Sequence, residues 1–155
     1  MSSKMFVCTS VGIYREALTR GKIYEALDED LDKEQVKIKG DNNRTRWFRK
    51  YYFEDASCCV PIVESWKFDD EIQDESENSL EHIEITVTFS TGEKRWCSIC
   101  TKAGLADYID RNLDGSVLFF ENLIIVKSFT HDVVSDALNE LDQQNQLISA
   151  TRPLG

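Results

Sequence analysis

The sequence predicts an α+β protein, with a β-rich first third followed by elements in the order β-β-β-α-β-α. Two observations lead to this class. Short runs in which apolar and polar residues alternate are typical of half-buried strands, and most of them come early in the chain. Two later runs place apolar residues three and four positions apart, which is the spacing of one helix face. Because the first strands come in a group, the order does not favour a doubly wound parallel sheet.

The first 58 residues contain five short runs that predict strands: KMFVCTS, KIYEAL, QVKIKG, RTRWFR and KYYFE. In the third run, Val36 and Ile38 share one face, while Lys37 and Lys39 share the other. The segments DEDLDKE and GDNN, on either side of this run, are turn signals. Five short strands in so few residues predict a small barrel or a rolled sheet.

The segment RTRWFRKYYF, residues 44–53, combines four Lys or Arg side chains with five aromatic rings. In one straight strand neither face would be apolar, so we expect a bend near Arg49 or Lys50. The bend lets Phe53, with Trp47 or Phe48, enter the core. An alternative interpretation is a platform for single-stranded nucleic acid, with rings for stacking and cations for phosphate. The residues of that platform would be Arg44, Arg46, Trp47, Arg49 and Lys50.

The second part of the chain, residues 59–155, begins with three predicted strands. CCVPIVESWKF predicts a strand in which Pro61 marks the start or an edge position. HIEITVTFS and EKRWCSIC flank the turn TG and predict a hairpin. In the first arm of this hairpin, alternate residues form one apolar face: Ile83, Ile85, Val87 and Phe89.

Two helices with a strand between them are predicted to follow. Thr101 can cap a helix that runs through Leu113, and Thr130 can cap the final helix. VLFFENLIIVKSF is expected to contain a buried strand, placed at residues 123–127. The final helix has an apolar stripe at helical spacing, formed by Val134, Ala137, Leu138 and Leu141. The last residues, SATRPLG, are predicted to be a tail.

Charge is distributed unevenly along the chain. Residues 1–58 hold 11 Lys and Arg against 10 Asp and Glu, a net charge of +1, whereas residues 59–155 hold 7 against 18, a net charge of −11. The second part should therefore repel nucleic acid and acidic membranes and favour a basic partner. Its densest acidic loop lacks the glycine and the terminal glutamate of an EF-hand, so it is interpreted as a solvated run or a docking surface. The acids of this loop are Asp69, Asp70, Glu71, Asp74, Glu75 and Glu77.

The five cysteines form an odd number, which without an export signal indicates free thiols in a reducing compartment. Cys97 and Cys100 form a C-x-x-C at the end of a predicted strand. Adjacent Cys58 and Cys59 are a poor second ligand pair for zinc, because neighbouring strand residues point to opposite faces. We therefore expect structural thiols and no metal or other cofactor. A thiol- or metal-dependent enzyme remains an alternative.

The chain has no apolar run near the roughly 18 residues that a membrane helix needs. Its N-terminal segment soon turns polar, unlike a signal peptide. These patterns predict a cytoplasmic protein that does not bind a membrane, and they leave its oligomeric state open.

The stretch from LTRGKIYEALDED to QVKIKGDNNRTRWFRKYYFE resembles the small SH3-like barrels of bacterial and phage accessory proteins. The entry pattern T-x-G-K-x-Y of those barrels is matched by Thr19, Gly21, Lys22 and Tyr24. Residues 41–43 match the turn that follows, with Asn43 in place of the usual glycine. The resemblance covers about the first third of the chain and implies a fold and a habit of binding partners, not an activity. The second part is similar in size, acidity and element order to immunity proteins of bacterial toxin systems.

The sequence therefore predicts an SH3-like β-barrel at residues 1–58 and an acidic α+β domain, an antiparallel sheet with two helices, at residues 59–155. The expected function is non-enzymatic: a bacterial accessory or inhibitor protein whose acidic surface engages a basic protein. An immunity protein against a nuclease toxin is one concrete form. The alternatives are a nucleic-acid-binding module that uses residues 44–53 and a small thiol- or metal-dependent enzyme.

Overall fold

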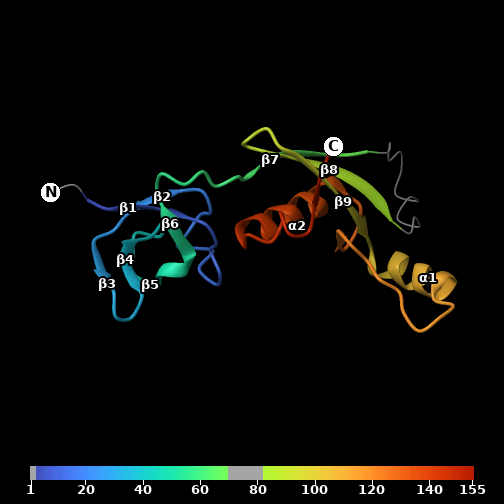
Figure 1. Cartoon of the computed structure of the whole chain (residues 1–155), viewed down its shortest axis with the longest axis horizontal. Helices are drawn as coiled ribbons and strands as arrows, with labels where there is room; N and C mark the ends of the chain where they lie inside the picture. The colour runs from blue at the N-terminus through green and yellow to red at the C-terminus, as the bar shows by residue number, and fades with distance from the viewer. Residues whose placement is uncertain (1–2, 70–81) are drawn as a thin grey trace. The chain divides into compact units, whose positions relative to one another are not determined.

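The computed structural model describes residues 3–69 and 82–155 (Figure 1). The chain forms two compact units. Unit 1 comprises Met1–Ile62 with Asp142–Asn145, and unit 2 comprises Val63–Leu141 with Gln146–Gly155. Strands fill the first unit, whereas strands and both long helices form the second, so the α+β class is confirmed.

Unit 1 contains two three-stranded antiparallel sheets. The first has the order β2-β1-β6, with strands β1 (Met5–Cys8), β2 (Ile23–Glu25) and β6 (Phe53–Asp55). The second has the order β3-β4-β5, with strands β3 (Asp28–Asp30), β4 (Gln35–Lys39) and β5 (Thr45–Arg49). The described strands do not close into one barrel. The polar segment predicted as a turn is partly a strand, because its first three residues pair with β4 as β3.

The bend expected after β5 is confirmed. A short 3-10 helix, η1 (Lys50–Tyr52), separates β5 from β6. Phe48 and Phe53 are buried on either side of it, and their ring centroids are 6.1 Å apart. Trp47 remains 37% exposed because successive strand residues face opposite sides of the sheet.

The T-x-G-K-x-Y pattern of unit 1 has a structural role. Thr19, Lys22 and Tyr24 all bond to the carboxylate of Asp41, with Thr19 Oγ1 donating to Oδ2 at 2.7 Å and the Tyr24 hydroxyl 3.0 Å from the same oxygen. Gly21 has φ of +86°, a conformation that glycine adopts without a steric penalty. Asn43 has φ of +63°, which explains how asparagine replaces the usual glycine, because asparagine tolerates the left-handed region.

Replacing Asp41 by asparagine should lower the free energy of unfolding at neutral pH by about 1–3 kcal/mol, the range for charged hydrogen bonds that are lost. Partial burial alone would raise the pKa of Asp41, but the hydrogen bonds from Lys22, Thr19 and Tyr24 outweigh it and lower that pKa. The carboxylate therefore stabilises the fold above its ordinary pKa of about 3.9 and loses this effect as the pH falls through the lower folded value. Urea unfolding of both proteins across the acid range will test this. An equally steep loss of stability in D41N would contradict it.

Arg20 is buried in unit 1 with its side chain 3% exposed. Its Nη1 lies 2.9 Å from Oδ1 of Asp142, whose side chain is 6% exposed. The guanidinium also donates to the carbonyl oxygens of Thr9 and Pro61 and to the side chain of Asn145. Burial lowers the pKa of Arg20, and the negative charge of Asp142 opposes that change. This pair is not evident from the sequence, because its members are 122 positions apart.

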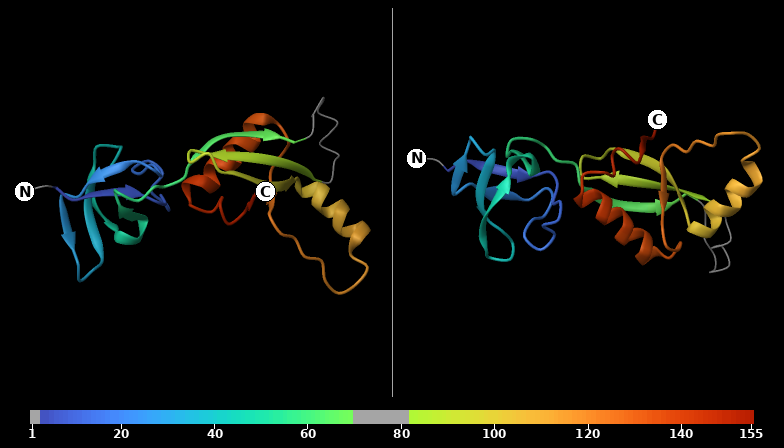
Figure 2. Two further views of the ribbon diagram at one scale, coloured as in Figure 1. Left: turned by 45° about the horizontal axis from the view of Figure 1, so that its top comes forward. Right: turned by 90° about the horizontal axis from the view of Figure 1, so that it is seen from below.

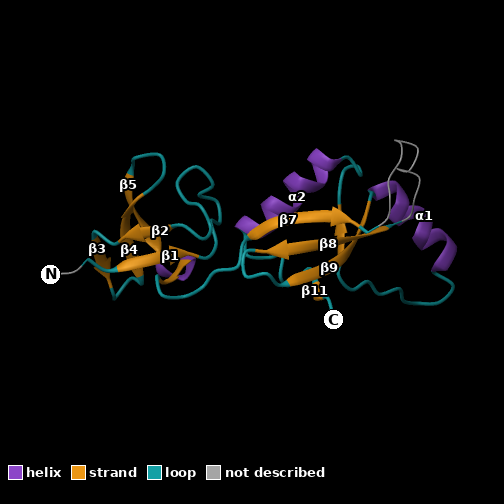
Figure 3. Ribbon diagram, turned by 90° about the horizontal axis from the view of Figure 1, so that it is seen from above, coloured by secondary structure: helices purple, strands orange, loops and turns teal. Residues whose placement is uncertain are grey.

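Unit 2 contains a mixed sheet of order β10-β9-β8-β7. Figure 3 shows its strands β7, β8 and β9 side by side. Its strands are β7 (Val63–Phe68), β8 (Ile83–Phe89), β9 (Lys94–Cys100) and β10 (Leu123–Ile125). The predicted hairpin is confirmed as β8 and β9, which pair antiparallel, whereas β10 pairs parallel to β9. The predicted tail is wrong in one respect, because β11 (Arg152–Pro153) also pairs with β9.

Two helices accompany this sheet. Helix α1 (Lys102–Asn112) follows β9 directly, and the predicted cap is confirmed because Thr101 Oγ1 accepts a hydrogen bond from Gly104 N at 3.1 Å. Helix α2 (His131–Gln143) lies along one face of the sheet (Figure 2) and buries Val134 and Leu138 there. Neither of these described helices is both long enough and apolar enough to span a bilayer.

Candidate functional site

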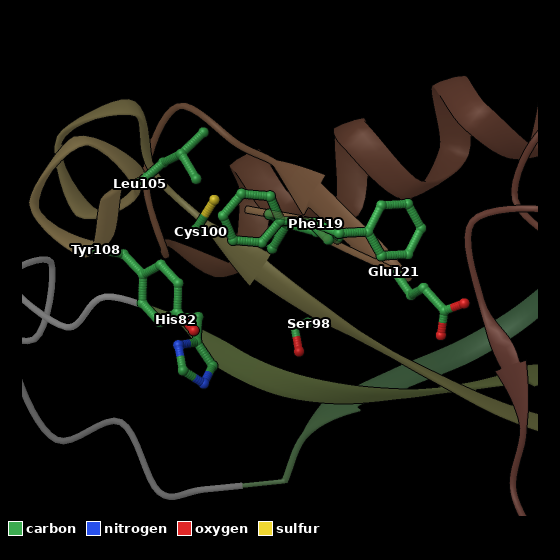
Figure 4. A pocket seen from close by; sticks show the side chains of 9 residues that line it. His82, Ser98, Cys100, Leu105, Tyr108, Phe119 and Glu121 are labelled. Atoms are coloured by element: carbon green, nitrogen blue, oxygen red, sulfur yellow. The ribbon is translucent and has the colours of Figure 1, made fainter. Parts of the chain in front are cut away.

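A pocket of about 220 Å³ opens in unit 2 where β9 meets α1 (Figure 4). Alternate residues of β9 enter it from one sheet face, α1 contributes residues from its first turns, and the segment before β10 returns to the same edge. Chemically distinct side chains meet there: His82, Ser98, Cys100, Tyr108, Phe120 and Glu121.

The C-x-x-C thiols of β9 point to opposite faces of the sheet, because the two residues are three positions apart on a strand. Cys97 lies in the core beneath α2, where burial raises its pKa to about 12, with a smaller contribution from the charge of Asp69. Cys100 faces the pocket but is only 1% exposed, and burial raises its pKa as well. A neutral thiol is a weak nucleophile and a poor metal ligand. This geometry disfavours a redox pair or a metal site shared by these two thiols.

The reactivity of the thiols should follow their burial. Exposed Cys58 and Cys59 should react with a disulfide reagent within minutes at about pH 8, whereas Cys8, Cys97 and Cys100 should react only after unfolding. Burial also raises the pKa of Cys8 to about 11. Mass spectrometry after timed labelling will locate the reacted residues. Rapid labelling of Cys100 in the folded protein would restore a thiol enzyme as a candidate.

Raised thiol pKa values also predict loss of stability in alkali. The folded state favours the neutral thiols of Cys8 and Cys97, so their contribution is complete below the ordinary pKa of about 8.5 and falls as the pH rises toward 11 and 12. Urea unfolding of C97S should show a shallower alkaline loss of stability than the parent protein.

An apolar surface adjoins the pocket. It is formed by the segment between α1 and β10, and we call it the apolar loop surface. Its side chains are Leu113, 43% exposed, Val117 and Phe119, each 77% exposed, and Phe120, 38% exposed. The strand predicted within VLFFENLIIVKSF at residues 123–127 is confirmed at its start, because β10 begins at Leu123, and it is shorter than predicted because it ends at Ile125. The signal for an exposed segment was the preceding DGS break together with the lack of alternation in VLFF.

The acidic loop predicted as a docking surface is described only at its first residue. Asp69 accepts a hydrogen bond from Thr86 Oγ1 at 2.6 Å. The other predicted docking residues lie outside the described residues: Asp70, Glu71, Asp74, Glu75 and Glu77.

The structure does not bring the predicted nucleic-acid residues onto one face. Arg46 lies over the ring of Tyr14 at 4.8 Å, and Lys50 pairs with Glu29 at 3.2 Å. Arg44 lies in the turn before β5. Only Trp47 and Arg49 share a face of the β3-β4-β5 sheet, because they are two positions apart on β5.

The register of this sheet adds two cations that the sequence analysis did not assign to the site. Lys37 lies directly across from Trp47, with its Nζ 5.8 Å from the indole ring, and Lys39 lies across from Thr45. Lys37, Lys39, Trp47 and Arg49 therefore lie on one side of the sheet, which we call the basic sheet face. Asp28 and Asp30 of β3 lie on the same side, because they pair with Lys37 and Gln35.

No protein-family model, curated protein or solved structure matches this chain. The function therefore has to be inferred from the chemistry of the described residues. Among these residues, the pocket of unit 2 has the most specific chemistry. Aromatic rings and the carboxylate of Glu121 line it, and the apolar loop surface lies beside it.

Proposed function

We propose that this is a non-enzymatic protein-binding protein whose acidic second part engages a basic protein partner. The observation that carries the proposal is the apolar loop surface, where Val117 and Phe119 stay 77% exposed beside a pocket. Exposed apolar patches rimmed by polar residues mark interaction sites. The net charge of −11 over residues 59–155 would steer a basic partner toward this surface and exclude acidic ones.

Within this proposal the protein is an accessory or inhibitor protein, of which an immunity protein against a nuclease toxin is one form. We also propose that unit 1 has an SH3-like fold, in which the small barrel stays open between its two sheets. Its two three-stranded antiparallel sheets and the turn held by Asp41 support that assignment. The sequence resemblance of this region is to accessory proteins that bind partners.

Capture from host lysate with a matched pair of variants tests the proposed surface. Phe119→Ser removes an exposed ring of unit 2, and Ile13→Ser removes an equally exposed apolar side chain of unit 1, 86% exposed. Wild type and I13S should retain the same basic protein after nuclease treatment and release it at high salt. F119S should retain it at least tenfold less well, the loss expected when an aromatic anchor worth about 2 kcal/mol is removed. Equal retention by all three proteins would overturn the proposed surface.

The acidic loop adds a kinetic test once that partner is purified. Replacing its six acids by their amides should slow association and flatten the dependence of the association rate on salt, because charges near an interface act chiefly on the encounter. Unchanged kinetics would remove this loop from the interface while leaving the apolar loop surface in place.

The basic sheet face favours a second candidate function, binding of single-stranded nucleic acid. A 37% exposed indole flanked by Lys37, Lys39 and Arg49 offers stacking and phosphate contacts together. Trp47→Ala should weaken binding of an oligothymidylate about 5- to 150-fold, the range for one lost stacking contact. Arg46→Ala, on the same strand but the opposite face, is the matched control and should change affinity less. Fluorescence anisotropy at several salt concentrations measures both effects, and equal losses in the two variants would contradict this candidate.

A further inference from the structure

Aromatic rings form one wall of the pocket in unit 2. The ring centroids of His82 and Tyr108 are 6.1 Å apart, and those of Tyr108 and Phe120 are 5.6 Å apart. Figure 4 shows His82 and Tyr108 toward one side of the pocket and Phe119 toward the other. The faces of such rings carry negative electrostatic potential and attract organic cations within about 6 Å.

The charged groups around the pocket, like the ring faces, favour a cation over an anion. Among the described lining residues Glu121 is a carboxylate, and none is a lysine or arginine. Glu84 lies directly across from Ser98 in the β8–β9 register, so it shares the sheet face on which Ser98 enters the pocket. The Cys100 thiol adds no negative charge, since burial raises its pKa. A cation entering the pocket therefore meets π faces and carboxylates, and it competes for Glu121 with one cation at the rim, Arg152.

A guanidinium already contacts the rim of this pocket. Arg152 Nη2 lies 2.9 Å from Oε2 of Glu121, and both side chains are more than half exposed. An exposed ion pair of this kind contributes little free energy, so Glu121 can exchange one guanidinium for another at small cost. The pair shows that the carboxylate at the rim is oriented to accept such a group.

The size of the pocket limits what can occupy it. Its volume of about 220 Å³ lies below the roughly 300–1,000 Å³ of sites for drug-sized ligands. It is large enough for one side chain or a small organic cation.

We propose that this pocket binds an organic cation, and that it anchors an arginine or lysine side chain of the basic partner. The inference rests on the proposed function for the identity of the partner, but the preference for a cation follows from the pocket itself. The apolar loop surface then packs beside the anchored side chain.

The preference can be measured with small probes and the full chain. Choline is compared with dimethylbutanol, in which a carbon atom replaces the quaternary nitrogen, and N-acetyl-arginine amide is compared with N-acetyl-leucine amide. NMR titration should show shifts at Tyr108 and Phe120 for the cations, with an affinity about tenfold above that of each neutral counterpart. Choline stands for a free organic cation, whereas N-acetyl-arginine amide stands for an arginine side chain of a protein.

Variants that keep the pocket apolar separate the cation effect from simple burial. Tyr108→Leu and Phe120→Leu should each weaken cation binding about 5- to 30-fold and leave the neutral probes little changed. Glu121→Gln, at an exposed position, should weaken the cations alone. Tyr51→Leu removes a 71% exposed ring of unit 1 and is the control.

The outcomes are distinct. Neutral probes that bind as tightly as the cations, or cations that shift no pocket resonance, would overturn the inference. If F119S loses the captured partner but the pocket shows no cation preference, the inference fails and the proposed function stands. If cations bind in the pocket but capture is unchanged in F119S, the proposed function fails and the pocket remains a cation site.

Discussion

Replacing Arg20 by methionine is expected to lower the free energy of unfolding of unit 1 by about 3–5 kcal/mol, the cost of breaking one side of a buried ion pair. Methionine keeps the apolar bulk of the side chain but removes the guanidinium from the buried carboxylate of Asp142, 2.9 Å away. The carbonyl oxygens of Thr9 and Pro61 lose donors at the same time. Few single substitutions exceed this range, because the change removes the guanidinium from a buried carboxylate and a donor from two carbonyl oxygens.

Urea unfolding, monitored by hydrogen exchange at peptide resolution, will measure this loss of stability for unit 1 separately from unit 2. The double variant R20M/D142L should recover a large part of the lost stability, because apolar side chains of similar volume replace both charges. Arg44→Met, at an exposed turn position, is the matched control and should change little. If R20M and R44M unfold at the same urea concentration, the ion pair and hydrogen bonds of Arg20 do not stabilise the fold.

Replacing Leu138 by alanine is expected to destabilise unit 2 by about 2–5 kcal/mol. Leu138 is 1% exposed and lies in the core between α2 and the sheet, with Val134 one turn before it. The loss combines the transfer free energy of the missing methyl groups with a cavity that the tightly packed sheet fills only in part.

The neighbouring exposed residue supplies the control for this substitution. Asn139→Ala changes the same helix one position along, on its outer side, and should leave the unfolding midpoint nearly unchanged. Urea unfolding, monitored by circular dichroism, gives the unfolding midpoints of L138A and N139A. A loss below about 1 kcal/mol in L138A would mean that α2 is not held by this core.

The elements that the sequence predicted well have a local cause. Strict alternation over Ile83–Phe89 requires a strand with one buried face, and the spacing from Val134 to Leu138 requires a helix with one buried stripe. Thr101 caps α1 through a bond to a residue only three positions away. Such features depend on neighbours in the chain, so they can be recognised without the fold.

The elements that the sequence analysis missed depend on distant partners. The final strand Arg152–Pro153 is too short to show a period, and it exists because β9 offers it an edge. The DGS break indicated an irregular segment before β10, but the apolar composition of VLFF did not show how far Phe119 and Phe120 stay exposed. The side of the sheet that carries Trp47 was set by the bend at η1 and by pairing with β4.

The sequence by itself determined the α+β class, the order of nearly all elements, the bend after β5 and the contrast in charge between the two parts of the chain. Only the tertiary structure decided which residues form a site. It placed Cys97 and Cys100 on opposite faces of one strand, joined Arg20 to Asp142 and gathered His82, Tyr108 and Phe120 around one pocket. The physical reason is that periodicity and capping act over a few residues, whereas a pocket or a buried ion pair is made by side chains that the chain brings together from far apart.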